Sequence, residues 1–176
     1  IYEQVTWYYV TSLIGKTLVL LIAPINTIVI SYLTKRKERL TRLQYGKAAL
    51  AGGIVSFVFF LACQVGTPLF VWLFYRNLYD SVKGIVTVVN LAQILGLYSA
   101  FLFILVLTFT DERWQLGLQL AHFGILLAVS IPAAKMCGLT GFAYASLGAN
   151  ILRVVAVIIL GLVKAQNGKE SKDEYR

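Results

Sequence analysis

Apolar residues fill five long stretches of this chain, and short polar segments separate them. The stretches cover residues 5–33, 48–73, 84–108, 114–133 and 141–163. A helix needs about 20 apolar residues to cross a bilayer, and each stretch reaches that length. The pattern therefore predicts an all-α, polytopic transmembrane bundle of about five helices, followed by a polar tail over 164–176.

The composition supports this interpretation and changes the meaning of the charge. Apolar types make up 59% of the 176 residues and charged types 14%, which is about half the charged share of a soluble domain. In a soluble protein the net charge of +8 would indicate a nucleic-acid partner. Here the charges lie between apolar stretches, so we interpret them as topology signals and expect no nucleic acid.

The basic residues are divided unevenly between the two sides of the predicted bundle. The loop after the first stretch, the loop after the third and the tail together hold eleven Lys and Arg residues. The two other loops hold three, Arg76, Lys83 and Lys135. Because cytoplasmic loops are enriched in Lys and Arg, we expect the basic loops and the C-terminus in the cytoplasm and the chain in the cell inner membrane. Basic loops also attract anionic membrane lipids.

Two charged residues lie deep inside predicted spans, Lys16 in the first and Arg153 in the fifth. A charge at the bilayer centre costs about 2.5–3.5 kcal/mol on insertion scales, and it usually faces a bundle interior or a wet cavity. Two alternatives stay open. Such residues also form hydrogen bonds between helices, or extend their long side chains to an interface.

Helical spacing places further polar residues on the same faces. The faces contain Tyr9, Ser12 and Lys16; Asn90 and Gln93; Gln115, Gln119 and His122; and Ser146, Asn150 and Arg153. Residues three, four and seven positions apart share one side of a helix, so four polar faces predict a common hydrophilic cavity. His122 also suits a packing role. The candidate substrate-binding residues are Arg153, Lys16, Asn150, Ser146, Ser12, Gln119 and His122.

The sequence lacks patterns that indicate catalysis or metal binding. All eight carboxylates lie outside the apolar stretches or at their ends, so the predicted cavity is positive and suits an anionic substrate. A single histidine and two distant cysteines have no metal-ligand spacing, and no Gly-rich phosphate loop is present. We therefore expect no enzymatic activity, no metal and no cofactor.

Three stretches resemble a known family. The first, SLIGKTLVLLIAPINTIVISYLTK, has a mid-span Pro24 and leads into a basic loop. The second is TPLFVWLFYRNLYDSV, and the third, IPAAKMCGLTGFAYASLGANI, places Gly138, Gly141 and Ala143 after a proline. Together they resemble the C-terminal part of the polysaccharide or O-antigen (Wzx-like) flippases, in the multidrug, oligosaccharidyl-lipid and polysaccharide exporter superfamily.

This resemblance implies a fold of about twelve or more spans in two lobes, with this chain as part of the second lobe. The start at Ile1 agrees with that expectation, and the first lobe would be its partner. The implied function is translocation of a polyprenyl-pyrophosphate-linked oligosaccharide across the inner membrane for polysaccharide biosynthesis. A multidrug exporter of the same superfamily and a non-catalytic membrane scaffold subunit stay open as alternatives.

Overall fold

The computed structural model describes residues 2–35, 40–107, 109–110 and 112–165. In these residues helices and their connections make up the whole fold, with no β-strand. The helices are α1 (Tyr2–Lys35), α2 (Arg42–Phe74), the 3-10 turn η1 (Arg76–Leu78), α3 (Tyr79–Val82), α4 (Val86–Leu107) and α5 (Glu112–Lys164). The prediction of an all-α bundle is confirmed. The polar tail predicted from 164 lies outside the described residues beyond Ala165.

α5 is a helical hairpin with two arms, and it contains both the fourth and the fifth apolar stretch. Gly138 separates the arms, with a φ of 58° and a ψ of −138°, a conformation that residues with a Cβ avoid. Residues 112–137 form the first arm and residues 139–164 the second arm. The sequence placed a loop between 133 and 141, whereas the structure reverses at one glycine and keeps both sides helical.

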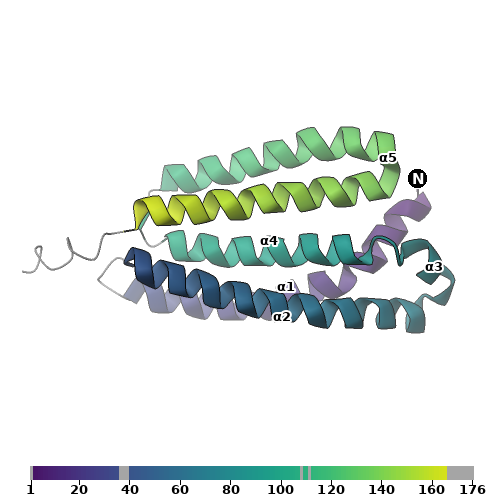
Figure 1. The fold of residues 1–176 in the computed structure, drawn as a ribbon, viewed down its shortest axis with the longest axis horizontal. Helices are drawn as coiled ribbons and strands as arrows, with labels where there is room; N and C mark the ends of the chain where they lie inside the picture. The colour runs from purple at the N-terminus through teal and green to yellow at the C-terminus, as the bar shows by residue number, and fades with distance from the viewer. Residues whose placement is uncertain (1, 36–39, 108, 111, 166–176) are drawn as a thin grey trace, which may run out of the picture.

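The two arms lie side by side along their length (Figure 1). Near the reversal, Gly141 lies so close to the Ala133 carbonyl that a Cβ would overlap it. At the far ends, the Lys164 ammonium lies 5.4 Å from the centre of the Trp114 ring. Each arm extends about 39 Å at 1.5 Å per residue, enough to cross a bilayer core of about 30 Å.

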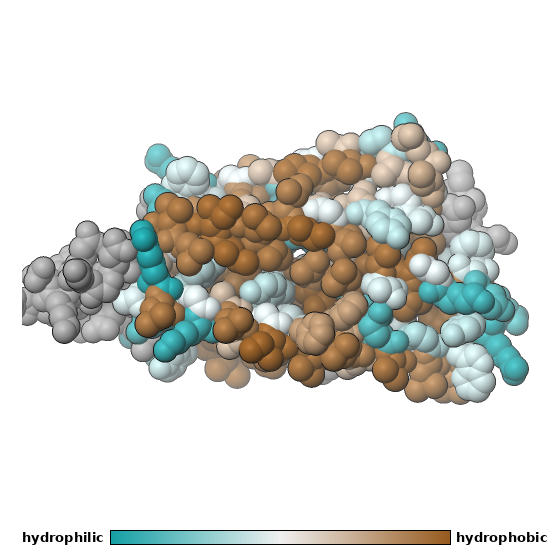
Figure 2. Space-filling view, in the orientation of Figure 1, coloured by the Kyte–Doolittle hydropathy of each residue, from teal (hydrophilic) through white to brown (hydrophobic). Residues whose placement is uncertain are grey.

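Four helices of the described chain, α1, α2, α4 and α5, are long and apolar enough to cross a membrane. Their outward faces expose large apolar side chains, which form much of the surface in Figure 2. In water such a surface would be unstable, but a lipid bilayer solvates it. The chain therefore has the build of a membrane-embedded protein.

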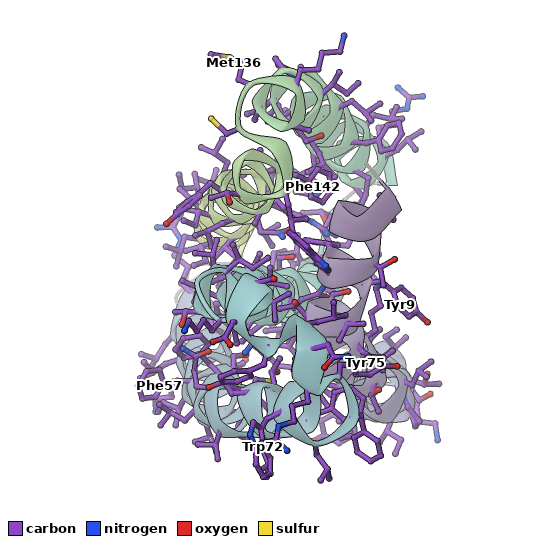
Figure 3. All side chains as sticks on the ribbon, turned by 90° about the vertical axis from the view of Figure 1, so that its right-hand side faces the viewer. Tyr9, Phe57, Trp72, Tyr75, Met136 and Phe142 are labelled. Atoms are coloured by element: carbon purple, nitrogen blue, oxygen red, sulfur yellow. The ribbon has the colours of Figure 1, made fainter. Side chains whose placement is uncertain are left out.

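α4 occupies the centre of the bundle. It packs against α1, α2 and α5, and 44% of its most apolar segment is buried, against 6% in α1. Figure 3 shows α4 between α2 and the α5 hairpin, with α1 along one side. A helix in this position contributes residues to any cavity between the helices.

The two ends of the bundle differ in what they contain. At one end lie Lys35, the start of α2, the end of α4 and both termini of α5, which we call the basic end (Figure 1). At the opposite end lie the start of α1, the connection over 75–85 and Gly138, which we call the turn end. The helix ends that border the three basic segments thus lie together, as the charge pattern predicts. The side of the membrane that they face stays a prediction.

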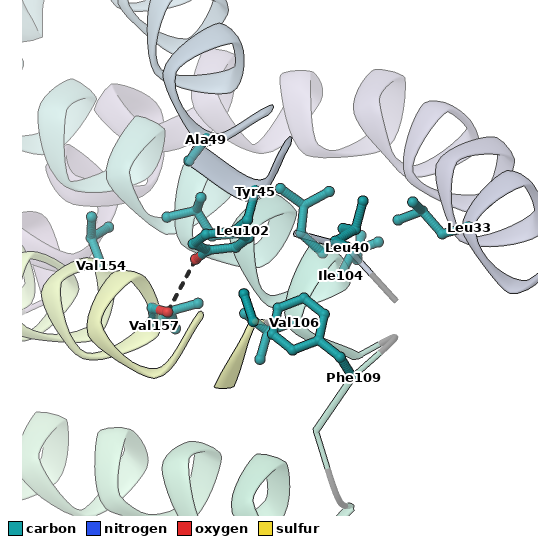
Figure 4. Packing of buried hydrophobic residues seen from close by; sticks show 12 residues of the cluster. Leu33, Leu40, Tyr45, Ala49, Leu102, Ile104, Val106, Phe109, Val154 and Val157 are labelled. Carbon is teal, nitrogen blue, oxygen red and sulfur yellow. Dashed lines mark hydrogen bonds between the residues drawn. The ribbon is translucent and has the colours of Figure 1, made fainter. Parts of the chain in front are cut away.

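Tyr45 closes the bundle near the basic end (Figure 4). Its hydroxyl donates a hydrogen bond of 3.1 Å to the Val157 carbonyl, and its ring meets Phe109 edge to face, with ring centres 5.9 Å apart. The ring lies directly against Gly161, where a side chain would overlap it. This contact joins α2 to the second arm of α5. A second apolar cluster, around Val71, Val82 and Val89, closes the turn end.

Candidate substrate cavity

An open-sided cavity of about 280 Å³ lies between α4, the second arm of α5 and α1. Its wall combines small, apolar and polar side chains: Ala92, Gln93, Gly96, Leu97 and Ala100 from α4, Ser146, Asn150 and Arg153 from the second arm, and Val19 from α1. Three of the predicted site residues, Ser146, Asn150 and Arg153, therefore line the same cavity as Gln93.

Close approach of α1 to α4 shapes one side of the cavity. A Cβ added at Gly15 would lie 2.9 Å from the Cβ of Gln93, closer than real Cβ atoms come. A glycine at position 15 therefore allows the two helices to touch at this level. One turn further along α1, Val19 reaches the cavity, so the α1 contribution to the wall is apolar.

Two polar side chains of the second arm connect the cavity wall to its neighbours. The Asn150 amide donates a hydrogen bond of 3.0 Å to the Ala92 carbonyl of α4. Ser146 lies near the Tyr8 hydroxyl of α1. The Asn150 hydrogen bond joins the second arm to α4 beside the cavity.

Arg153 is the charged residue of the cavity wall. It is half-buried, and Gly96 and Ala100, which line the cavity with it, lie near the middle of α4. One terminal nitrogen of its guanidinium donates a 3.0 Å hydrogen bond to the Gln119 side-chain oxygen. A guanidinium has five N–H donors, and this is its one hydrogen bond among the described residues. No buried N–H group of Arg153 is left without a partner in the described part of the chain.

The first arm brings two predicted residues to Arg153. Gln119 accepts the hydrogen bond from Arg153. His122 lies near Arg153 and near the Ala149 backbone. The structure therefore brings together Arg153, Asn150, Ser146, Gln119 and His122, which is the greater part of the predicted set.

Lys16 and Ser12 lie apart from this group. Lys16 is exposed, and its ammonium lies 4.6 Å from the centre of the Tyr9 ring, on the outer side of α1 (Figure 3). Since helix side chains lean toward the N-terminus, the ammonium points to the turn end. This placement agrees with the alternative in which a long basic side chain extends to the membrane interface. Ser12 is fully buried and donates to the Tyr9 carbonyl at 3.0 Å. Neither residue lines the cavity.

Asn90 has a different role from its neighbour Gln93. It is 1% exposed, and its amide nitrogen donates to the Cys63 carbonyl and to the Gln64 side chain, both at 3.1 Å. Its side-chain oxygen accepts a 3.1 Å hydrogen bond from the Thr67 hydroxyl. We call these contacts the Asn90 clamp. They join α4 to α2, so Asn90 forms hydrogen bonds between helices instead of lining the cavity.

Gln115 also lies outside the cavity, because its side chain donates to the Thr110 carbonyl at 3.1 Å. Sequence reasoning did not single out Tyr8, Val19 or Gly96, whose place at the site depends on contacts between helices. In the part of the chain that the structure describes, no group of three or more His, Cys, Asp and Glu residues is arranged to hold a metal ion.

Comparison with known proteins identifies no relative of this chain. No family model matches the chain, and neither a curated protein nor a solved structure matches it. The resemblance to Wzx-like flippases therefore depends on the three sequence stretches alone.

Proposed function

We propose that this chain is part of a membrane transporter that translocates a polyprenyl-pyrophosphate-linked oligosaccharide across the inner membrane. The observation that supports the proposal is Arg153, a charged side chain near the middle of the second arm, in a cavity wall that also contains Ser146 and Asn150. A guanidinium stays charged under physiological conditions and matches phosphate oxygens with two parallel hydrogen bonds. The carrier lipid offers such oxygens at its pyrophosphate.

The size of the cavity limits which part of this substrate enters it. Ligand sites for drug-sized molecules usually measure about 300–1,000 Å³, and this cavity holds about 280 Å³. A pyrophosphate group is compatible with that volume, whereas a whole oligosaccharide is not. In this proposal the pyrophosphate binds beside Arg153, and the sugars and the lipid chain lie outside the cavity.

The charge of the cavity favours this substrate over a cationic drug. Its lining residues include Arg153 and no carboxylate, so a cationic compound would be repelled. A drug exporter with this wall would need a negative group from outside the described residues. In the proposed cycle, Arg153 exchanges its hydrogen bond to Gln119 for the phosphate oxygens and returns to Gln119 on release.

Replacement of Arg153 in the full-length protein tests the proposal. Arg153→Ala is expected to abolish glycan export while the protein stays in the membrane at near-normal amounts. Arg153→Lys keeps the charge but loses the planar pair of donors, so we expect partial export. Arg76→Ala, a basic residue at the turn end, is the matched control and should export normally.

Two results would contradict this assignment. Normal export by Arg153→Ala would remove the arginine from the transport step. A loss of folded protein as the sole effect would make Arg153 structural and favour the scaffold alternative. Resistance to cationic dyes on expression of the unaltered protein would instead favour the multidrug exporter.

A further inference from the structure

The basic end exposes five basic side chains that the structure describes, Lys35, Arg42, Lys47, Arg113 and Lys164. None of them forms an ion pair with a described carboxylate. The one ion pair among the described residues lies at the turn end, between Lys83 and Asp80 at 2.8 Å. Figure 2 shows hydrophilic residues at both ends of the molecule, with the apolar band of the helices between them.

Two of these cations belong to a corner where α2 begins and α5 ends. The Arg42 guanidinium donates a 3.4 Å hydrogen bond to the carbonyl of Ala165, the residue after Lys164. The Lys164 ammonium lies over the Trp114 ring at 5.4 Å from its centre. The described partners of both side chains, a backbone carbonyl and an indole ring, carry no charge.

The turn end provides an internal comparison. There the Arg76 guanidinium lies 5.9 Å from the centre of the Trp72 ring, the same type of contact as at Lys164. Nearby, the hydrogen bond to Asp80 and the charge of Asp80 raise the pKa of Lys83 above its usual value, so this pair has no net charge. The two ends share a cation–aromatic contact, but among the described residues the basic end exposes five basic side chains and the turn end three, Arg76, Lys83 and Lys135.

Exposed apolar side chains lie close in sequence to the residues of the corner. Leu43 follows Arg42 and is 69% exposed, and Leu116, two residues after Trp114, is 63% exposed. Tryptophan is enriched where the headgroups of a bilayer begin. A pair of cations for a phosphate, an interfacial ring and exposed leucines for acyl chains together match a phospholipid better than a soluble polyanion.

We infer that Arg42, Lys164 and Trp114 form a binding site for the headgroup phosphate of an anionic phospholipid. The two cations bind the phosphodiester, and the acyl chains lie along Leu43 and Leu116. Because the site joins α2 to α5, a bound lipid stabilises the bundle at its basic end. The inference does not depend on the proposed transport function.

Lipid binding to the purified chain in neutral detergent tests the inference. Phosphatidylglycerol and phosphatidylcholine with the same acyl chains are added, and bound lipid is counted by native mass spectrometry while the thermal midpoint is recorded. We expect preferential, saturable binding of phosphatidylglycerol with a rise in the midpoint. Near a membrane surface each basic residue contributes about fivefold in affinity, so Arg42→Gln and Lys164→Gln should each weaken binding about fivefold, and the double variant about 30-fold.

Matched variants separate this site from general surface charge and from misfolding. Arg76→Gln should bind phosphatidylglycerol like the unaltered chain, and Arg42→Lys with Lys164→Arg should keep the preference. Equal binding of the two lipids, an unchanged preference in the double Gln variant, or an equal loss in Arg76→Gln would each overturn the inference. Displacement of the lipid by millimolar inorganic phosphate would also overturn it, because the site would then select free phosphate.

Discussion

Two asparagines attach α4 to its neighbours, and they do so in different surroundings. Asn90 of α4 uses its nitrogen and its oxygen in the Asn90 clamp with α2, and it is 1% exposed. Asn150 of α5 makes one hydrogen bond to the Ala92 carbonyl and lines the cavity. Asn90 lies in a tightly packed contact between two helices, whereas Asn150 lies beside an unfilled cavity. Complete hydrogen bonding identifies a packing role, and a polar wall with remaining volume identifies a candidate site.

Replacement of Asn90 should have the largest effect on stability. Asn90→Leu removes the three hydrogen bonds of the clamp and leaves the Thr67 and Gln64 side chains to find other partners. Hydrogen bonds between membrane helices contribute about 0.6–2 kcal/mol, and we expect Asn90→Leu to lower the free energy of unfolding by about 1–2 kcal/mol. Asn150→Leu is the matched control, with an expected loss of about 0.5 kcal/mol. Unfolding in mixed micelles measures both values.

Equal losses from the two asparagine variants would remove the distinction between a clamp and a site. A larger loss from Asn150→Leu than from Asn90→Leu would reverse it, and the second arm would then depend on Asn150 for its position. Either result would also weaken the assignment of the neighbouring Arg153 to substrate.

The elements of this fold were predictable from local patterns, but their contacts were not. Apolar length and helical spacing are local properties, so they predicted the helices and most of the polar faces. The reversal at Gly138 was not predictable, because Gly141 lies three residues away and spacing alone does not show which glycine turns the chain. The structure uses Gly138 for its positive φ and Gly141 for close contact with Ala133.

The candidate site was predictable to the same extent and for the same reason. Spacing placed Asn90 and Gln93 on one face, yet one joins the clamp and the other lines the cavity. The difference depends on which helix packs beside each residue. Likewise, the contact of Gly15 with Gln93 turns Val19 to the cavity and leaves Lys16 outside. A single helix does not encode which of its faces another helix will meet.

Filling the cavity should separate stability from transport on the α5 side of α4. Ala100 lines the cavity, and Ala100→Leu would place three more carbon atoms in that volume. We expect glycan export to be lost while the free energy of unfolding changes by less than about 1 kcal/mol, since the added side chain enters open space rather than a packed core. Export assays and unfolding in micelles provide the two measurements.

A matched substitution outside the cavity controls for the added volume. Val155 is exposed on the second arm, so Val155→Leu should leave both export and stability unchanged. Normal export by Ala100→Leu would show that the substrate does not enter this cavity, and the proposed site would be wrong even if the chain is a transporter.

The smallest effect on stability is expected for Gln119, the residue that accepts the hydrogen bond from Arg153. If Arg153 exchanges Gln119 for phosphate oxygens during transport, Gln119 is a competitor and not a support. Gln119→Leu should then lower the free energy of unfolding by no more than about 0.6 kcal/mol, the average for such a bond, and it should keep or slightly increase export. Gln115→Leu is the control, because Gln115 has the same side chain on the same arm but bonds to Thr110.

Loss of export in Gln119→Leu to the level of Arg153→Ala, with normal export by Gln115→Leu, would show that Gln119 and Arg153 act as one unit. Arg153 would then be held by Gln119 in its working position, and the exchange step would have to be abandoned.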